Sequence, residues 1–164
     1  MGVLKWLGLG ILLVCATPVY ADMGWSSYLN ARYGYETAVP PGFTGLGEPD
    51  AHDGQVFRSG DGRSKLTVWG GYLVHATFDE ELRQRLDDLK RGGWTITYQA
   101  TTPSWGSYSG TRGQRIIYLR EISGCKAEQY AIFQLDYPAV QITTMKPLID
   151  RLVAGLRQRL CPGG

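Results

Sequence analysis

Apolar and polar positions follow a period of two over much of the chain. In the run 65–70, for example, Leu66 and Val68 alternate with Lys65 and Thr67, which places the two sets on opposite faces of a strand. Clusters of Gly, Pro, Asp and Ser bound such runs, as turns require. The pattern predicts strands at residues 33–39, 55–58, 65–70, 94–101, 105–109, 115–122 and 128–137. The last four are linked by turns and predict an antiparallel meander.

The period changes to that of a helix in two places. Thr77 and Glu80 form a capping-box pattern, and apolar residues then recur at helical spacing as far as the glycine pair at 92–93. A second apolar stripe through Leu148, Leu152 and Leu156 predicts a helix at about 144–160. Together these elements predict an α+β fold, with a single antiparallel sheet of about six to seven strands packed with two main helices.

The N-terminal segment has the pattern of a cleavable secretory signal. A positive charge at Lys5 precedes an apolar run at 6–14, and Pro18 and the small residue Ala21 precede the expected cut. Residues 1–21 are therefore expected to be removed, leaving a single periplasmic or secreted domain at 22–164. The apolar run is shorter than the roughly 18 to 20 residues that cross a bilayer, so no transmembrane segment is predicted.

A lipoprotein signal is the alternative interpretation of this segment. Cys15 would then be acylated and retained as an anchor. Val14 stands where a small residue normally precedes the cysteine, so the cleaved signal is favoured.

Cleavage also determines the cysteine chemistry. Without Cys15, the remaining thiols are Cys125 and Cys161, and an even number in an oxidising compartment favours a disulfide. Such a bond would join the end of the last helix to the turn between the last two strands. Two unpaired thiols are the alternative.

The charge balance argues against nucleic acid as a partner. Without Lys5, the 17 Lys and Arg residues of the chain become 16, against 15 Asp and Glu. The basic residues are scattered along the sequence, and a nearly neutral chain of this kind has no electrostatic basis for binding a polyanion.

The order of elements resembles a known fold. The opening strand with its proline stop at 33–43, the hairpin around 60–62 and the middle and closing helices resemble the fold shared by the photosystem subunit PsbP, the Ran-binding Mog proteins and several small bacterial exported or lipid-anchored proteins. The stretches 66–70 and 105–110 are also similar to uncharacterised proteobacterial exported proteins. The resemblance covers most of residues 22–164 and implies a PsbP/Mog-like sandwich, used mostly for binding and assembly. No active residue is carried over with it.

The loop at 48–54 is the candidate for metal chemistry. Asp50, His52 and Asp53 are candidate ligands, because carboxylates suit hard cations and an imidazole adds a nitrogen for zinc or manganese. The spacing fits no established loop motif, and a solvated polar loop is the alternative. A metal-dependent or hydrolytic enzyme centred on Glu48 to Asp53, with or without His75, remains an alternative function, although the chain has no Gly-x-Ser-x-Gly elbow.

Aromatic residues on or beside the predicted strands are the candidates for a binding surface. Such residues line apolar pockets and anchor interfaces, and an arginine near them, Arg112, Arg115 or Arg120, would add charge. The predicted ligand or partner surface comprises Trp69, Tyr72, Trp105, Tyr108, Arg112 and Tyr118; Trp94, Tyr98 and Tyr130 also lie on predicted strands. For each aromatic residue the alternative is an ordinary core position.

The favoured hypothesis is a non-catalytic periplasmic binding or accessory protein. It would present the aromatic-rich surface to an envelope protein partner or a small apolar ligand, and it would need no cofactor. The alternatives are the enzyme described above and an envelope immunity or interaction protein.

Overall fold

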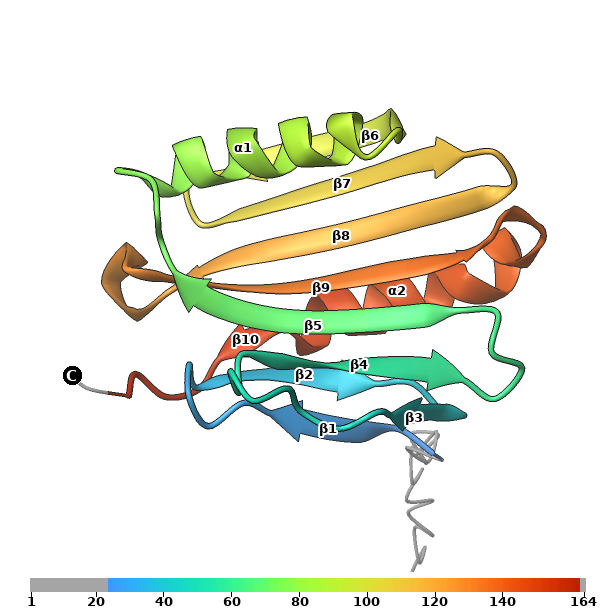
Figure 1. Ribbon diagram of the computed structural model, residues 1–164, viewed down its shortest axis with the longest axis horizontal. Coiled ribbons are helices and arrows are strands. Elements are labelled where there is room, and N and C mark those ends of the chain that lie inside the picture. The colour runs from blue at the N-terminus through green and yellow to red at the C-terminus, as the bar shows by residue number, and fades with distance from the viewer. Residues whose placement is uncertain (1–23, 163–164) are drawn as a thin grey trace, which may run out of the picture.

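The computed structural model describes residues 24–162, which form two antiparallel sheets and two helices (Figure 1). The strand order is β3-β4-β5-β9-β8-β7-β6 in the seven-stranded sheet and β1-β2-β10 in the three-stranded sheet. The large sheet comprises β3 (Phe43–Gly45), β4 (Gly54–Ser59), β5 (Lys65–Tyr72), β6 (Thr95–Thr102), β7 (Trp105–Arg112), β8 (Arg115–Gly124) and β9 (Gln129–Pro138). The small sheet comprises β1 (Ser26–Leu29), β2 (Tyr35–Val39) and β10 (Arg157–Gln158).

The predicted hairpin and meander are confirmed. β4 pairs antiparallel with β5, and β6 to β9 pair in succession. In the β4–β5 turn, the Asp61 carboxylate accepts hydrogen bonds from the Ser59 hydroxyl at 2.5 Å and the Arg63 amide at 3.0 Å. Gly62 has a φ of 68°, which glycine adopts without strain. The turn residues therefore act as the sequence predicts.

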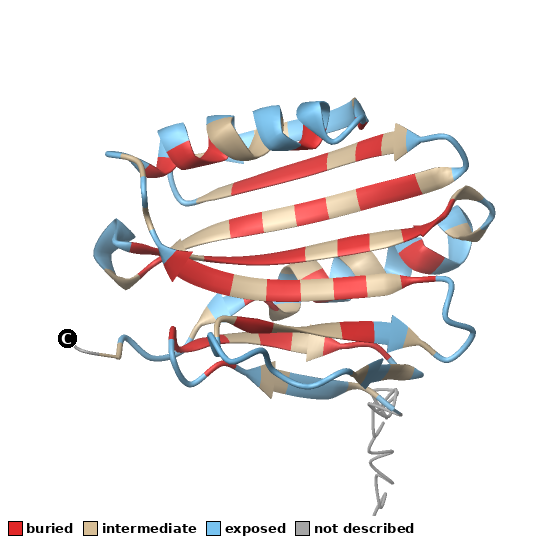
Figure 2. Ribbon diagram, in the orientation of Figure 1, coloured by how far each residue is buried: buried red, intermediate tan, exposed pale blue. Residues whose placement is uncertain are grey.

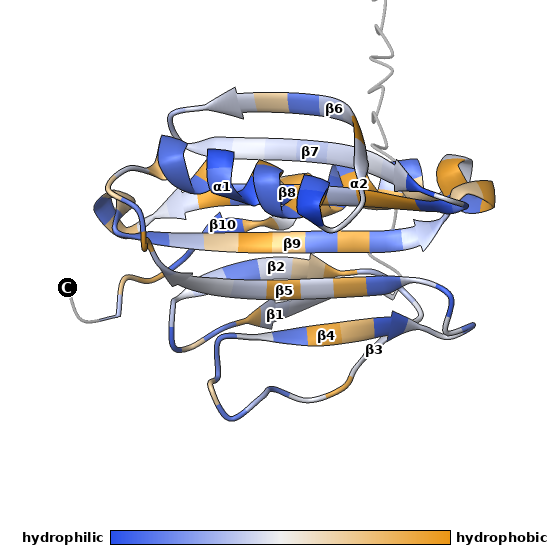
Figure 3. Cartoon of the chain, turned by 45° about the horizontal axis from the view of Figure 1, so that its top comes forward, coloured by the Kyte–Doolittle hydropathy of each residue, from blue (hydrophilic) through white to orange (hydrophobic). Residues whose placement is uncertain are grey.

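Helix α1 (Phe78–Arg91) begins at the predicted capping box. The Thr77 hydroxyl accepts a hydrogen bond from the Glu80 amide at 3.2 Å, and the Glu80 carboxylate accepts one from the Thr77 amide at 3.1 Å. Phe78, Leu82 and Leu89 are buried against the large sheet. The outward side of the helix is strongly hydrophilic (Figure 3).

Helix α2 (Ile142–Gly155) ends well before the predicted position 160. Gly155 lies against β2, where a Cβ atom would come within 2.8 Å of the Ala38 Cβ, so the helix approaches closely only because it has a glycine there. The chain then becomes extended and forms β10, in which Arg157 pairs with Glu36 of β2. Leu160 consequently belongs to an extended segment and not to the helix. The apolar stripe could not show this, because leucines fit either conformation.

The prediction of a single sheet is wrong in one respect, because the predicted first strand belongs to a second sheet. β2 pairs with β1 and β10 and packs face to face on the large sheet. A Cβ atom at Gly70 of β5 would lie 2.7 Å from the Tyr35 ring, so the absent side chain makes room for that ring. The Tyr35 hydroxyl also donates a hydrogen bond to the Asp53 carbonyl at 3.0 Å. Alternation along β2 indicates a strand but does not identify its pairing partner.

The central strands β5, β8 and β9 of the large sheet are covered on both faces, as their buried and intermediate positions show (Figure 2). We call its two faces the α1 face and the α2 face. On the α1 face, α1 packs mainly on β6, β7 and β8. On the α2 face, α2 packs on β8 and β9, and the small sheet packs beside it over β4 and β5.

The two covers are therefore offset along the sheet. Seven strands about 4.8 Å apart make a sheet about 29 Å wide, whereas a helix is only about 10 Å across. On the α2 face the cover stops short of β6 and β7. On the α1 face it ends near Trp69 of β5, where the Arg85 guanidinium carbon lies 5.7 Å from the centre of the Trp69 ring. Each face thus has one open end.

The disulfide prediction is supported. Cys125 and Cys161 are joined, with their Cα atoms 5.4 Å apart. Cys125 lies in a one-turn 3-10 segment, Cys125–Ala127, whose three residues have φ values of 47°, 60° and 62°. The amides of Arg159 and Leu160 also donate hydrogen bonds to the Gly34 carbonyl, at 2.8 and 3.0 Å. The C-terminal segment is therefore attached to both sheets.

The predicted signal, with Lys5 and Cys15, lies outside the described residues. Within residues 24–162, neither helix has the length and apolar character needed to cross a bilayer.

Removing the disulfide should lower the free energy of unfolding. For C125S/C161S we expect a loss of about 3 to 4 kcal/mol, because the unfolded chain regains the entropy of a long open loop. Urea unfolding followed by tryptophan fluorescence measures this, with the reduced wild type as the matched control. Equal urea midpoints for the oxidised wild type and the double variant would show that the bond contributes nothing.

Candidate functional site

The open end of the α2 face presents side chains from three adjacent strands. Register pairs Tyr118 of β8 with Ser109 of β7 and Ser109 with Tyr98 of β6, so these three residues form one row across the sheet. The next row contains Arg120, Ser107 and Ala100. Small residues at the centre of both rows leave space above the sheet.

The N-terminal part of α2 forms the other wall, and a groove lies between the helix and the sheet. It encloses about 730 Å³, and apolar atoms predominate in its lining. Its lining residues are Tyr98, Ser109, Tyr118, Tyr137, Ile142, Thr143, Lys146, Ile149 and Asp150. We call it the tyrosine groove.

The walls of the tyrosine groove combine fixed and exposed side chains. The Tyr118 ring stacks on Phe133 of the core, with centroids 6.0 Å apart and planes inclined by 19°. Tyr98 of β6 and Ile142 of α2 are 49% and 55% exposed, so both walls of the groove present apolar surface to solvent. At the rim, Lys146 and Asp150 of α2 form an ion pair at 2.7 Å.

A stacked pair adjoins the groove on the same face. The Arg120 guanidinium lies 3.8 Å from the centre of the Trp105 ring, and its Nη1 donates a hydrogen bond to the Ser107 hydroxyl at 3.0 Å. Burial lowers the pKa of Arg120, and the nearby Tyr118 and Tyr98 act against this shift. The pair extends the aromatic wall and adds a positive charge.

The predicted aromatic surface is divided between the two faces of the sheet. Trp105 and Tyr118 lie on the α2 face, beside or within the tyrosine groove. Tyr108 lies on the α1 face, where it is buried and donates a hydrogen bond to the Leu82 carbonyl at 3.0 Å. Trp69 is also on the α1 face, under Arg85.

The two remaining predicted surface residues lie elsewhere. Tyr72, at the end of β5, is 59% exposed and makes an edge contact with Tyr33. The Arg112 guanidinium carbon lies 4.5 Å from the centre of the Trp94 ring. Arg112 also donates a hydrogen bond at 2.8 Å to the Gly92 carbonyl, just after the end of α1. Of the six predicted residues, the structure therefore places Trp105 and Tyr118 on the α2 face at its open end, with Arg120 between them.

The acidic loop at 48–53 is attached to the small sheet. Glu48 accepts a hydrogen bond from the Tyr28 hydroxyl at 2.5 Å and lies 3.1 Å from the His52 Nδ1, and these contacts lower its pKa. The His52 carbonyl accepts a hydrogen bond from the Asn30 side chain at 2.9 Å. The contacts of the loop therefore join the two sheets.

The residues predicted as metal ligands are not gathered into a site. Asp50, His52 and Asp53 do not converge, and within residues 24–162 there is no group of three or more His, Cys, Asp and Glu side chains able to hold a metal ion. His75 lies in the segment before α1, half-buried, well separated along the chain from the acidic loop.

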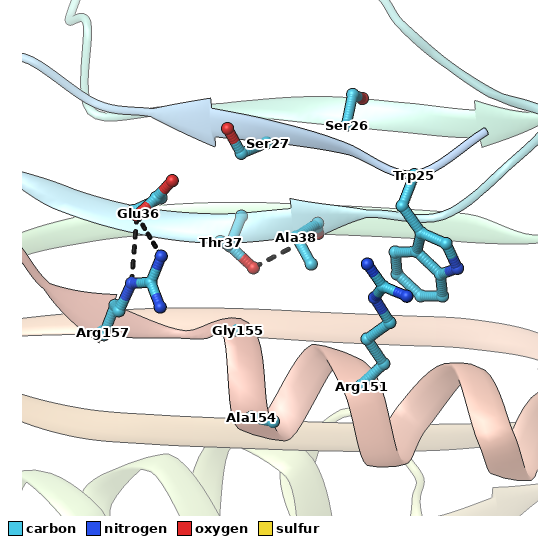
Figure 4. Close-up of a pocket in the computed structure, with 10 residues that line it drawn as sticks. All are labelled: Trp25, Ser26, Ser27, Glu36, Thr37, Ala38, Arg151, Ala154, Gly155 and Arg157. Carbon is cyan, nitrogen blue, oxygen red and sulfur yellow. Dashed lines mark hydrogen bonds and ion pairs between the residues drawn. The ribbon is translucent and has the colours of Figure 1, made fainter. Parts of the chain in front are cut away.

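A second cavity, of about 520 Å³, lies between the small sheet and α2 (Figure 4). The Arg151 guanidinium stacks 4.5 Å from the Trp25 ring at one end of it. At the other end Arg157 binds Glu36 through Nε at 3.0 Å and Nη2 at 2.9 Å, and this hydrogen bonding is the main reason that the pKa of Glu36 is lowered. The ion pair joins β2 to β10 and therefore stabilises the small sheet.

A buried ionic cluster lies on the opposite side of the sheet, beneath α1. Arg85 is 3.2 Å from the Glu81 carboxylate and 3.3 Å from that of Glu121. The Glu121 side chain is fully buried, and burial raises its pKa to about 7 in spite of Arg85. Two carboxylates share one guanidinium there, and one oxygen of each has no hydrogen-bond partner among the described residues.

The groove includes residues that the predicted surface lacks. Tyr98 follows a bulge between Ile96 and Tyr98, so its face could not be read from alternation. Ile142 and Ile149 are seven residues apart, and this spacing was a usable signal because it defines a helix face beside the leucine stripe. Arg120 is one of the three candidate arginines named from the sequence. The sequence alone does not show which of the three lies on the same face of the sheet as the groove.

Comparison with known proteins identifies the fold. No protein-family model matches the sequence, and no curated protein matches it. Among solved structures, the cyanobacterial PsbP (CyanoP) of Synechocystis sp. PCC 6803 superposes with a TM-score of 0.62 at 14% identity, covering 88% of this chain and 98% of that one. This chain has a PsbP/Mog-like fold. The Ran-binding protein Mog1p of Saccharomyces cerevisiae superposes with a TM-score of 0.60 at 12% identity, over 84% of this chain and 96% of that one. The resemblance stated from the sequence is thus confirmed at the level of fold.

The buried cluster predicts a pH dependence of stability. Because folding raises the pKa of Glu121 from 4.5 to about 7, the folded state holds a proton that the unfolded state releases in this range. The protonation of Glu121 therefore contributes fully to the free energy of unfolding below pH 4.5, and this contribution is lost as the pH rises through 7. E121Q removes this titration. Relative to E121Q, the wild type should lose stability on the order of 3 kcal/mol between about pH 4.5 and 8.

Urea unfolding at several pH values measures this difference. D87N, which changes an exposed carboxylate of α1, the helix that covers Glu121, should follow the wild-type profile. Parallel profiles for the wild type and E121Q would mean that Glu121 does not titrate in this range.

Proposed function

We propose that this chain is an exported, non-catalytic binding protein whose tyrosine groove takes up the apolar part of a small ligand. The observation that carries the proposal is the groove itself, which is open, mainly apolar and of small-molecule size at about 730 Å³. Tyrosines suit such a site, because their rings supply apolar area and their hydroxyls remain near water.

The composition of the groove supports binding without chemistry. Its ionisable groups, apart from the tyrosines, are Lys146 and Asp150, which neutralise each other at the rim. A catalytic site typically brings perturbed acid and base groups together in its cleft. The strongly perturbed carboxylate, Glu121, instead lies beneath α1, on the other face of the sheet. The enzyme hypothesis centred on the 48–53 loop accordingly receives no support from this geometry.

Export is part of the proposal. The signal pattern at 1–21 is its sequence basis, and the Cys125–Cys161 pair supports it, because such bonds persist in oxidising compartments. We therefore propose a periplasmic or secreted domain that begins at residue 22.

A second candidate function is the binding of an envelope protein partner, as an accessory, immunity or interaction protein would do. It is favoured by the similarity to Mog1p, which is described as a Ran-binding protein. The exposed Tyr98 and Ile142 would then receive apolar side chains of the partner.

Removing the exposed wall of the groove tests the proposed function. We expect decan-1-ol, an uncharged apolar probe, to bind the wild type, and Y98A to weaken binding about tenfold through the loss of apolar contact area. Isothermal titration calorimetry measures both affinities. Y72A is the matched control, because Tyr72 is 59% exposed and distant from the groove, and its affinity should equal that of the wild type.

Two other results would change the proposal. Equal weakening by Y98A and Y72A would mean that decan-1-ol binds elsewhere. Failure of the wild type to bind it, together with a partner from envelope extract that is retained by Y72A and lost by Y98A, would favour the protein-binding function.

A further inference from the structure

Arg120 lies directly beside the tyrosine groove. It is two residues from Tyr118 on the same face of β8, which corresponds to about 7 Å along the strand. On its other side it stacks on Trp105. Its cross-strand neighbour on β9 is the core residue Phe133, whereas on the other side Ser107 of β7 and then Ala100 of β6 are small, so little side-chain volume covers the sheet on that side of Arg120.

The guanidinium has no anionic partner. Of its five N–H groups, one donates to the Ser107 hydroxyl, and Nε is buried without a hydrogen-bond partner among the described residues. Within residues 24–162, no Asp or Glu oxygen lies within 4.0 Å of it, whereas Arg85, Arg115 and Arg157 each pair with a carboxylate. The burial that lowers the pKa of Arg120 also shows that this cation is partly removed from water.

A partly buried cation without an anionic partner destabilises a fold, because the hydration it loses is only partly replaced, here by the Ser107 hydroxyl and the Trp105 ring. The strand positions on this face beside it are uncharged: Tyr98, Ala100, Trp105, Ser107, Ser109 and Tyr118. The guanidinium is thus a positive charge on the same face of the sheet as the tyrosine groove, and Arg120 is two residues along β8 from Tyr118, which lines the groove. An apolar groove with such a cation beside it matches a molecule with an apolar chain and an acidic end.

We propose that Arg120 binds the anionic headgroup of the ligand whose apolar part occupies the tyrosine groove, so that the ligand is an acidic amphiphile. A carboxylate and a phosphate both match the planar N–H groups of arginine. The assignment rests on the proposed function, because it requires an apolar ligand in the groove. It adds the chemical class of that ligand.

Three probes of equal chain length test the assignment by calorimetry on the disulfide-bonded mature protein at pH 8. Decanoate and decyl phosphate carry an anionic headgroup, and decan-1-ol carries none. We expect at least one anionic probe to bind the wild type ten- to a hundredfold more tightly than decan-1-ol, as for a charge-assisted hydrogen bond. The tighter of the two anionic probes identifies the headgroup as a carboxylate or a phosphate.

R120M keeps the apolar length of the side chain and removes the charge. It should bring the anionic and neutral probes to within about twofold of each other, mainly by weakening the anionic probes. R112M is the matched control, since Arg112 also stacks on a tryptophan but lies on the α1 face, and it should keep the full preference. If R120M does not fold, salt provides the second test. Raising NaCl from 0.05 to 0.5 M should then weaken anionic binding to the wild type and leave decan-1-ol binding unaffected.

Each contrary outcome has a distinct meaning. Equal affinities of all three probes for the wild type, a preference that survives in R120M, or anionic binding that is indifferent to salt would overturn the role of Arg120 and leave the proposed groove intact. Failure of all three probes to bind the wild type would instead remove the proposed function, and this inference with it.

Discussion

The width of the seven-stranded sheet is the constraint on which the rest of the structure depends. A sheet about 29 Å wide cannot be covered by one helix about 10 Å across, so each face needs more than one layer element or keeps an open end. Here α1 covers the β6 to β8 end of one face, and α2 with the small sheet covers the opposite end of the other. The tyrosine groove lies where the second cover stops.

Close backbone approaches hold that cover in place. Gly70 admits the Tyr35 ring between the sheets, and Gly155 lets α2 reach β2 at Ala38. The Glu36–Arg157 ion pair and the Cys125–Cys161 disulfide then attach the end of the chain to both sheets. The position of α2 over β8 and β9 follows from these contacts, and with it the wall that carries Ile142 and Ile149.

Local patterns predicted the elements well, and long-range pairing poorly. The capping box at Thr77, the β4–β5 turn and the four-strand meander are encoded by adjacent residues, and all three are confirmed. The placement of β2 in a separate sheet depends on Gly70, far away in sequence, and the early end of α2 depends on contact with Ala38. The sequence predicted the binding surface only in part. Trp105 and Tyr108 are close in sequence but lie on opposite faces of β7, and which face carries the groove depends on long-range packing.

The central claim is that ligand binds at the open end of the α2 face, and the tryptophan indoles report on it directly. Trp105 lies on that face, whereas Trp69 and Trp94 lie on the α1 face. Titration of ¹⁵N-labelled protein with decanoate, followed through the indole N–H resonances, should shift the Trp105 signal and leave those of Trp69 and Trp94 in place. A shift of Trp69 with Trp105 unmoved would contradict the account, because it would place the ligand at the open end of the α1 face.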